Sequence, residues 1–245
     1  MKRFRNTNPA KSTMDTFHRI IMDTFDTVCH VKARLGGKYL SWCHVMDGQK
    51  YVCMDDLMDD ISRQDCLVYS FGIGGDWTFE DEISSFGCKV YAYDPTIDHK
   101  GVRSNSISFK KIGLVGKPKK DTPYQTLSHI LKENGHINKT ISYLKLDIEA
   151  NEIYGLPIWL KSGALKNVNQ IAMEIHLLNK LGNTEEKMSQ EFLQTLKDLA
   201  LQANFRIFNW EANSCWKNTF AKNHKYFSLV EIVMKRISPT GSCAM

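Results

Sequence analysis

The sequence predicts an α/β fold with a mainly parallel sheet that helices cover on both faces. After residue 66, short apolar runs alternate with stretches of helical periodicity. This alternation is typical of βαβ units, because parallel strands need a crossover connection. The last two strand-like runs, residues 205–210 and 226–236, have no helical pattern between them. We therefore expect that final pair to be antiparallel, at one end of the sheet.

The size and composition fit one substantial domain. The chain has 245 residues, of which 42% are hydrophobic and 24% charged, so a packed core needs no disulfides or metal to support it. Residues 13–31 carry apolar side chains at helical intervals and predict an N-terminal helix. Residues 35–60 contain Gly36-Gly37 and Asp47-Gly48, and we expect a connecting or capping segment with a short strand near residues 51–53.

The sheet region has a regular order of expected elements. The first five strands are predicted at residues 66–71, 89–93, 106–109, 141–148 and 170–177. The helices are predicted at residues 78–86, 123–134, 152–162 and 184–203. The chain should thus divide into an N-terminal helix and cap (1–50), the sheet domain (51–236) and a C-terminal tail (237–245).

Charge and hydropathy indicate the compartment and the partners to expect. The net charge of +5 comes from 32 basic and 27 acidic residues, without a basic stripe of the kind that nucleic-acid binding requires. No run approaches the ~18 apolar residues of a membrane span. The charged start, residues 1–5, is followed by polar residues, which predicts no signal peptide and a cytoplasmic protein. A trimmed sequence would look the same, so the secretory pathway stays open.

The cysteines are odd in number, so at least one of the seven stays unpaired within the chain. Cys29, Cys43, Cys53 and Cys66 lie in or beside the segment that precedes the sheet. Any disulfides should tie that segment to itself or to the first strand. No Cys/His spacing typical of zinc occurs, and we expect no metal.

A glycine-rich turn follows the first strand, in the run Phe71-Gly72-Ile73-Gly74-Gly75-Asp76. Glycines between a strand and a helix let backbone amides approach a ligand closely. Asp76 would repel a phosphate, so the turn favours a cationic ligand over a pyrophosphate. The alternative is a tight turn without a ligand.

The second strand ends in Tyr93-Asp94-Pro95. A carboxylate at the tip of the second strand is placed to accept two hydrogen bonds from a ribose. Taken alone, Asp before Pro is as typical of a turn. Together with the glycine turn, Asp94 is predicted to bind a nucleoside.

Acidic residues and a histidine follow the fourth and fifth strands. Asp147 ends an apolar strand, and Glu174 and His176 alternate on the next strand, so they share one face. Such a group can act as a general base or position a hydroxyl. A structural histidine is the alternative for His176. Glu149 and Glu152 fit either a site or the first turn of the following helix.

These motifs together resemble the class I S-adenosylmethionine-dependent methyltransferases, and more narrowly the FkbM-like branch and the methyltransferase-like protein 24 group. The resemblance covers residues 51–236 and rests on the runs 68–74, 91–95, 144–149 and 173–176. It implies a Rossmann-like sheet of seven strands whose last strand is antiparallel.

The resemblance also implies roles for the residues of these motifs. The turn with Phe71, Gly72, Gly74, Gly75 and Asp76 would hold the methionyl part of S-adenosylmethionine; Asp94 with Pro95 would hold the ribose, and Gly113 would lie near the adenine. Asp147, Glu174 and His176 would be the catalytic residues. The implied reaction is O-methyl transfer to a hydroxyl, for example of a sugar, on a small-molecule or glycan acceptor.

Two positions depart from the family pattern. Ser70 stands where an acid is usual, and Ala150 where a glycine is usual. They leave a second reading open, a catalytically inactive module that binds a cofactor or a partner. A third reading, a nicotinamide-dependent oxidoreductase, is less favoured, because it predicts a cleaner glycine pattern and a sheet without the antiparallel end.

Overall fold

The computed structural model describes residues 16, 20, 28–99, 103–176, 185–213, 215, 219–221, 224–226 and 229–237. The predicted helix at residues 13–31 lies mostly outside these, but its two described residues near the start, Thr16 and Ile20, are helical. Where its end is described, residues 28–31 form turns and bends rather than helix. The expected C-terminal tail also lies outside the described residues, apart from Ile237.

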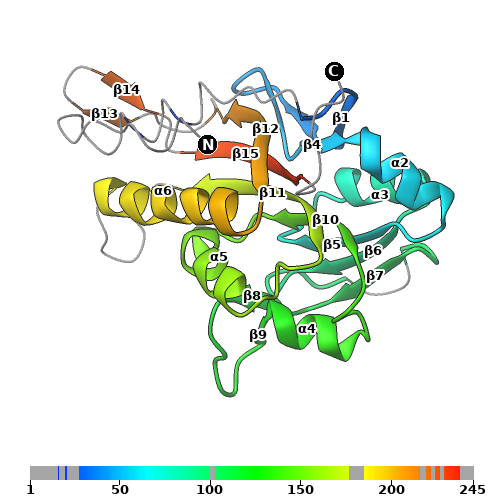
Figure 1. Cartoon of the computed structure of the whole chain (residues 1–245). Coiled ribbons are helices and arrows are strands. Elements are labelled where there is room, and N and C mark those ends of the chain that lie inside the picture. Colours follow the sequence, from blue (N-terminus) through cyan, green and yellow to red (C-terminus); the bar gives the residue numbers. More distant parts are fainter. Residues whose placement is uncertain are drawn as a thin grey trace, which may run out of the picture.

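A seven-stranded sheet forms the centre of the molecule (Figure 1). Its strands, in spatial order, are β12 (Phe205–Ala212), β15 (Leu229–Arg236), β11 (Val168–His176), β10 (Ile141–Leu146), β5 (Leu67–Phe71), β6 (Lys89–Tyr93) and β7 (Ile107–Lys110). The five strands from β11 to β7 are parallel, and β15 runs antiparallel between β11 and β12. The predicted fold is therefore confirmed, including the antiparallel last strand.

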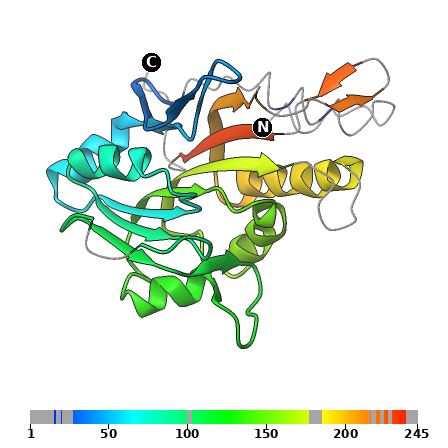
Figure 2. The same cartoon turned by 180° about the vertical axis from the view of Figure 1, so that it is seen from behind.

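Helices cover both faces of the sheet (Figures 1 and 2). On one face, α4 (Leu127–Glu133), α5 (Asn151–Lys161) and α6 (Glu185–Gln202) contribute to an apolar core that includes Leu127, Trp159 and Phe192. On the other face, α2 (Met54–Ser62) and α3 (Thr78–Ser85) contribute Leu57 and Phe79 to a second core. Strands buried on both faces explain the continuous apolar runs in the sequence.

The cap is more structured than the sequence predicts. The short hairpin β2 (Lys38–Leu40) and β3 (Val45–Asp47) is followed by β4 (Lys50–Cys53), which pairs with β1 (Lys32–Leu35). The expected strand near residues 51–53 is confirmed as β4. Helix α2 was not expected, because residues 35–60 were interpreted as a connection; its apolar positions Met54 and Leu57 are few, but they are buried.

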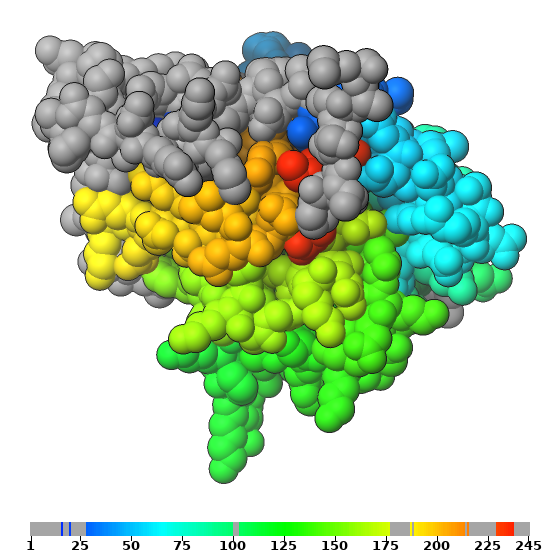
Figure 3. Space-filling model, viewed as in Figure 1, coloured from blue at the N-terminus to red at the C-terminus, as the bar shows by residue number. Residues whose placement is uncertain are grey.

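Two further parallel strands and a hairpin complete the described elements. β8 (Gly113–Val115) pairs with β9 (Tyr124–Thr126), so the helix expected from residue 123 begins only at Leu127. β13 (Thr219–Ala221) pairs with β14 (His224–Tyr226). Residues 117–123, between β8 and β9, are exposed and project from the body of the molecule (Figure 3).

Three disulfides join cysteines that are far apart in sequence: Cys29–Cys53, Cys43–Cys215 and Cys66–Cys88. Cys29–Cys53 ties the N-terminal segment to itself, as expected. The other two differ from expectation, because Cys43 bonds to the segment after β12 and Cys66 to the residue before β6. Cys243 lies outside the described residues.

None of the described helices combines the length and the apolar character that a membrane span needs.

Candidate functional site

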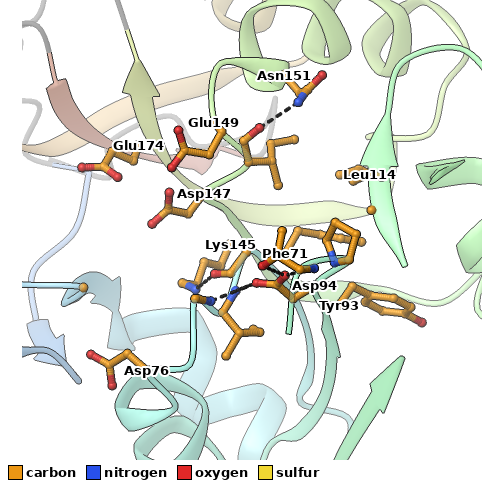
Figure 4. Close-up of a pocket in the computed structure, with 18 of the residues that line it drawn as sticks. Phe71, Asp76, Tyr93, Asp94, Leu114, Lys145, Asp147, Glu149, Asn151 and Glu174 are labelled. Carbon is orange, nitrogen blue, oxygen red and sulfur yellow. Dashed lines mark hydrogen bonds between the residues drawn. The ribbon is translucent and has the colours of Figure 1, made fainter. Parts of the chain in front are cut away.

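A cavity of about 720 Å³ opens at the carboxyl ends of the central parallel strands. Ligands of open α/β sheets bind at this edge. The cavity brings together most of the residues singled out in the sequence (Figure 4). From the predicted set, its lining includes Phe71, Gly72, Gly74, Asp76, Asp94, Pro95, Gly113, Asp147, Glu174 and His176. Gly75 belongs to the same turn but does not line the cavity.

The glycine turn is built by backbone geometry. Gly72, Gly74 and Gly75 all have positive φ angles, of +81°, +58° and +82°, which L side chains rarely adopt. A Cβ on Gly72 would lie 1.7 Å from the carbonyl oxygen of Asp147, so the turn and the end of β10 touch through their backbones. A Cβ on Gly74 or Gly75 would meet nothing within 4 Å. The turn is therefore closed toward the sheet and open toward a ligand.

Asp94 is buried, with 3% exposure, and holds this turn in place. Its Oδ2 accepts hydrogen bonds from the amides of Ile73 (2.8 Å) and Gly74 (2.9 Å). Its Oδ1 accepts from the amide and the hydroxyl of Thr96. Burial alone would raise the pKa of Asp94, but these hydrogen bonds lower it, so the carboxylate stays charged. A ribose that binds here must share the carboxylate with the turn or displace Thr96.

The remaining residues that the sequence analysis predicts for a cofactor lie on either side of the turn. Asp76 accepts a hydrogen bond from the amide of Thr78, the first residue of α3, and its carboxylate lies 3.4 Å from the ammonium of Lys38. At the other end, Gly113 lies so close to the ring of Tyr124 that a Cβ would come within 2.3 Å of it, and 3.1 Å from Pro95. Gly113, Tyr124 and Pro95 are therefore packed against one another, and all three line the cavity.

Ser70 stands at the position where the resembled family usually has an acid, and a carboxylate lies next to its side chain. Its hydroxyl donates to Glu80 of α3 at 2.6 Å, and Glu80 is fully buried. The ammonium of Lys145 lies 3.3 Å from Glu80 and donates to the carbonyl of Gly72. Ser70, Glu80 and Lys145 thus form a buried polar cluster behind the glycine turn, in which neither Ser70 nor Glu80 lines the cavity. The lysine inside the apolar strand 141–146 is the sequence feature that indicates a buried acid.

Asp147, Glu174 and His176 come together as predicted from the two adjacent strands. One carboxylate oxygen of each acid and one ring nitrogen of His176 lie within 4.8 Å of one another. The Nε2 of His176 lies 3.5 Å from Glu174 and 3.9 Å from Glu149. Glu152 instead begins α5, where it is buried and accepts from the Ile148 amide; burial first, and then neighbouring acids, raise its pKa to about 8. Glu149 therefore belongs to the site, and Glu152 supports the backbone beside it.

The two carboxyls of this trio are held in different protonation states. Burial would raise the pKa of Asp147, but the ammoniums of Lys50 and Lys145 lower it. Burial and the negative charges of Asp147 and Glu231 raise the pKa of Glu174 well above its usual range. An ionised carboxylate next to a protonated carboxyl is the arrangement of an acid–base pair.

Cap residues that the sequence reasoning missed close the cavity on this side. Asn213 donates both to Asp47 of β3 (3.0 Å) and to Glu174 (3.2 Å). Lys38, Leu40 and Gly48 line the same wall. Asp47-Gly48 was interpreted only as a turn, because nothing in its local pattern indicates a contact with residues about 130–165 positions away.

Comparisons with known proteins give one family match. A family model described as "Methyltransferase domain" matches residues 2–227. No entry among the curated proteins matches.

Solved structures that resemble the chain include a chain of a fibrillarin/Nop5p complex, with 13% identity and a TM-score of 0.43, over 82% of this chain and 90% of that one. A putative hemolysin from Streptococcus thermophilus has 14% identity and a TM-score of 0.42, over 79% and 71% of the two chains. A putative SAM-dependent methyltransferase from Streptococcus mutans has 10% identity and a TM-score of 0.38, over 78% and 52%.

Proposed function

The chain belongs to the methyltransferase-domain family, and we propose that it transfers a methyl group from S-adenosylmethionine to a hydroxyl of a small-molecule or glycan acceptor. One observation carries this proposal. A single cavity has a glycine turn that is open to a ligand at one end and an ionised carboxylate beside a protonated carboxyl at the other.

The described residues fit S-adenosylmethionine at the glycine end. Open space above Gly74 and Gly75 leaves room for a ligand against the backbone. Asp94 offers a charged acceptor for the ribose. The ring of Tyr124, which packs against Gly113 and lines the cavity, offers a flat surface on which a base can stack. When bound, this cofactor supplies a methyl group on a positively charged sulfur. Asp76 lies in this half of the cavity, and the acidic end lies across from it, so the cavity favours a cation over an anion.

The acidic end supplies what a hydroxyl acceptor needs. As the new O–C bond forms and the bond from carbon to sulfur breaks, the electron pair stays on sulfur and the hydroxyl loses its proton. The ionised carboxylate of Asp147 can take that proton. Glu174, Asn213 and His176 can hold the hydroxyl by hydrogen bonds. A carboxylate acceptor is disfavoured, because it would meet several acids at once.

We favour a sugar hydroxyl as the acceptor. Within the methyltransferases, we favour a place in the FkbM-like branch, beside the methyltransferase-like protein 24 group. Polar side chains from the cap and from three strands, rather than aromatic ones, surround the acidic end of the cavity. Such a lining suits a ligand with several hydroxyl groups. Lys50 carries a positive charge close to the carboxylates, and this charge can take the place of a metal ion. That the reaction needs no metal remains a prediction.

Calorimetry tests the cofactor. We expect S-adenosylmethionine and S-adenosylhomocysteine to bind and NAD not to bind. Absence of binding by either sulfur nucleotide at millimolar concentration would reject the methyltransferase proposal. Binding without methyl transfer to any acceptor in a mass-shift screen of cell extract would favour the inactive module.

Glu174→Gln and His176→Asn test the acidic end. Both variants should keep the affinity for the cofactor within about twofold, since neither residue is in the glycine turn. They should lower turnover by about 10–10²-fold, the cost of a lost hydrogen bond to the acceptor hydroxyl. An equal loss of cofactor binding in both variants would assign them a structural role instead.

We also infer that the protein works in an oxidising compartment. Six of its seven cysteines pair in three disulfides, and such bonds persist in secreted and lumenal proteins. Peptide mapping without reduction, on protein taken from its native cells, should recover all three linkages. Free thiols at these six positions would favour the cytoplasm.

A further inference from the structure

Lys50, the first residue of β4, is buried in an unusual place for a lysine. Its side chain is 1% exposed, and lysines are almost never fully buried unless they are paired. β4 pairs with β1 and lies against β11 and β15 of the main sheet, which carries the ammonium group to the acidic end of the cavity. The residue belongs to the cap, outside the part of the chain in which the methyltransferase motifs lie.

Four acids form a row across adjacent strands beneath Lys50. Glu174 of β11 is directly opposite Glu231 of β15, which is directly opposite Glu211 of β12. Asp147 follows Leu146, the partner of Met173, and so continues the row at the end of β10. Like charges directly opposite each other on a sheet destabilise it. A row of this kind needs protons or a cation.

The Lys50 ammonium provides that positive charge. It forms an ion pair with Glu231 and lies 3.6 Å from Asp147. Lys145, the other buried lysine on this side, is already engaged by Glu80 and by the Gly72 carbonyl. The Tyr143 hydroxyl, which also faces Lys50, donates to the Tyr51 carbonyl.

The charges around Lys50 and Asp147 are consistent with this arrangement. Burial would lower the pKa of Lys50, but Glu231, Asp147 and Glu174 raise it, so the ammonium stays protonated. Glu231 has a pKa near 7, because burial raises it and Lys50 opposes that increase. Asp147 faces Lys50, Lys145, His176 and Glu174, and its carboxylate oxygen lies 3.6 Å from the Lys50 ammonium.

We propose that Lys50 is a positioning residue for the proposed methyl transfer: its buried ammonium bridges Asp147 and Glu231 and keeps Asp147 ionised, ready to accept the proton of the acceptor hydroxyl. Its catalytic meaning rests on the function proposed above, whereas the effect on the charge of Asp147 does not. The cap is then part of the reaction centre, because it supplies the charge that allows one acid of the row to remain a base.

The test measures the ionisation of Asp147 directly. Protein labelled with ¹³C at the aspartate carboxyls is titrated by NMR, and Asp147→Asn assigns the resonance. In Lys50→Met the titration midpoint of Asp147 should move upward by about 1–3 pH units, as expected when an opposite charge within 4–6 Å is removed. In Lys50→Arg, which keeps the charge, the midpoint should stay near that of the wild type.

A second neutral variant keeps the test decisive. Lys50→Gln retains a hydrogen-bond donor and is used if Lys50→Met does not fold; the same upward shift is expected. An unchanged midpoint in a folded Met or Gln variant would overturn the proposal. The titration needs neither cofactor nor acceptor, so failure of S-adenosylmethionine to bind would reject the proposed function without deciding the role of Lys50.

Discussion

The two ends of the cavity are built in different ways. At the cofactor end, the ligand-facing surface is mainly backbone: a glycine turn of positive φ that Asp94 holds through two amides. At the acidic end, the surface consists of side chains from the cap, β10, β11 and the segment after β12, which Figure 4 shows for Asp147, Glu149 and Glu174. The first end depends on local geometry, and the second depends on long-range contacts.

This difference has consequences for substitution. A side chain added at Gly72 has no room to adjust, because the neighbouring atoms belong to the backbone of Asp147 at the end of β10. The acidic end can lose one group and keep its shape, but the balance of charge in the row changes. Variants of the first end should therefore disturb folding or cofactor binding, and variants of the second should change the acceptor reaction.

Gly72→Ala should give the largest effect. The added Cβ would overlap the Asp147 carbonyl and would also force an L residue to φ +81°. We expect a loss of about 3 kcal/mol or more in the free energy of unfolding, with no measurable cofactor binding. Chemical denaturation and calorimetry check this result.

Gly135→Ala is the matched control for Gly72. It has a similar φ of +73°, but its Cβ would meet nothing within 4 Å. Its cost should be only about 1–2 kcal/mol, with normal cofactor affinity. Equal destabilisation in the two variants would show that the contact with β10 is not what restricts the turn.

Removal of the Cys43–Cys215 disulfide tests whether the acidic end can be disturbed without an effect on the end proposed for the cofactor. This bond links the connection between β2 and β3 to the segment next to Asn213, so it fastens the cap wall. Replacing both cysteines by serine should lower the free energy of unfolding by about 2–4 kcal/mol and reduce turnover, while cofactor affinity stays within about twofold. A large loss of cofactor affinity would show that the two ends do not behave independently.

Asp94→Ala should weaken cofactor binding by about 1–3 kcal/mol, the cost of losing hydrogen bonds to a charged group. The reason is twofold, since Asp94 both anchors the amides of Ile73 and Gly74 and faces the cavity. Calorimetry with S-adenosylhomocysteine measures the loss. Thr96→Val separates the two roles, because it removes one hydrogen-bond donor to Asp94 without changing the glycine turn. Unchanged affinity in Asp94→Ala would mean that the ribose is held elsewhere.

How far the sequence could predict the molecule follows the same division. The strands and most helices of the sheet were predictable, because period and apolar runs are local signals, and the glycine turn with Asp94 is local too. Asp147, Glu174 and His176 were also predictable, since adjacent parallel strands end at one edge. The protonation states of these three side chains could not be predicted from the sequence.

The parts that could not be predicted depend on distant residues. Lys50 is 97 positions from Asp147 and 181 from Glu231, and nothing near it in the sequence indicates an acid. The link from Cys43 to Cys215 spans 172 residues. The row of acids becomes visible only when the register of β15 between β11 and β12 is known.

The smallest expected effect lies at Ala150, where the turn after β10 meets the acidic end. Ala150 stands in the position of the family's glycine and has a φ of +74°, next to Glu149 at +58°. Ala150→Gly should relieve about 1–2 kcal/mol of left-handed strain but lose about 0.5–1 kcal/mol to the added freedom of the unfolded chain. A net gain of up to about 1 kcal/mol in the free energy of unfolding is expected. Ala164→Gly is the control: this residue lies at a buried turn without a positive φ, so the substitution should be destabilising. A loss of stability in both variants would mean that packing of the Ala150 methyl group contributes more free energy than the left-handed backbone strain costs.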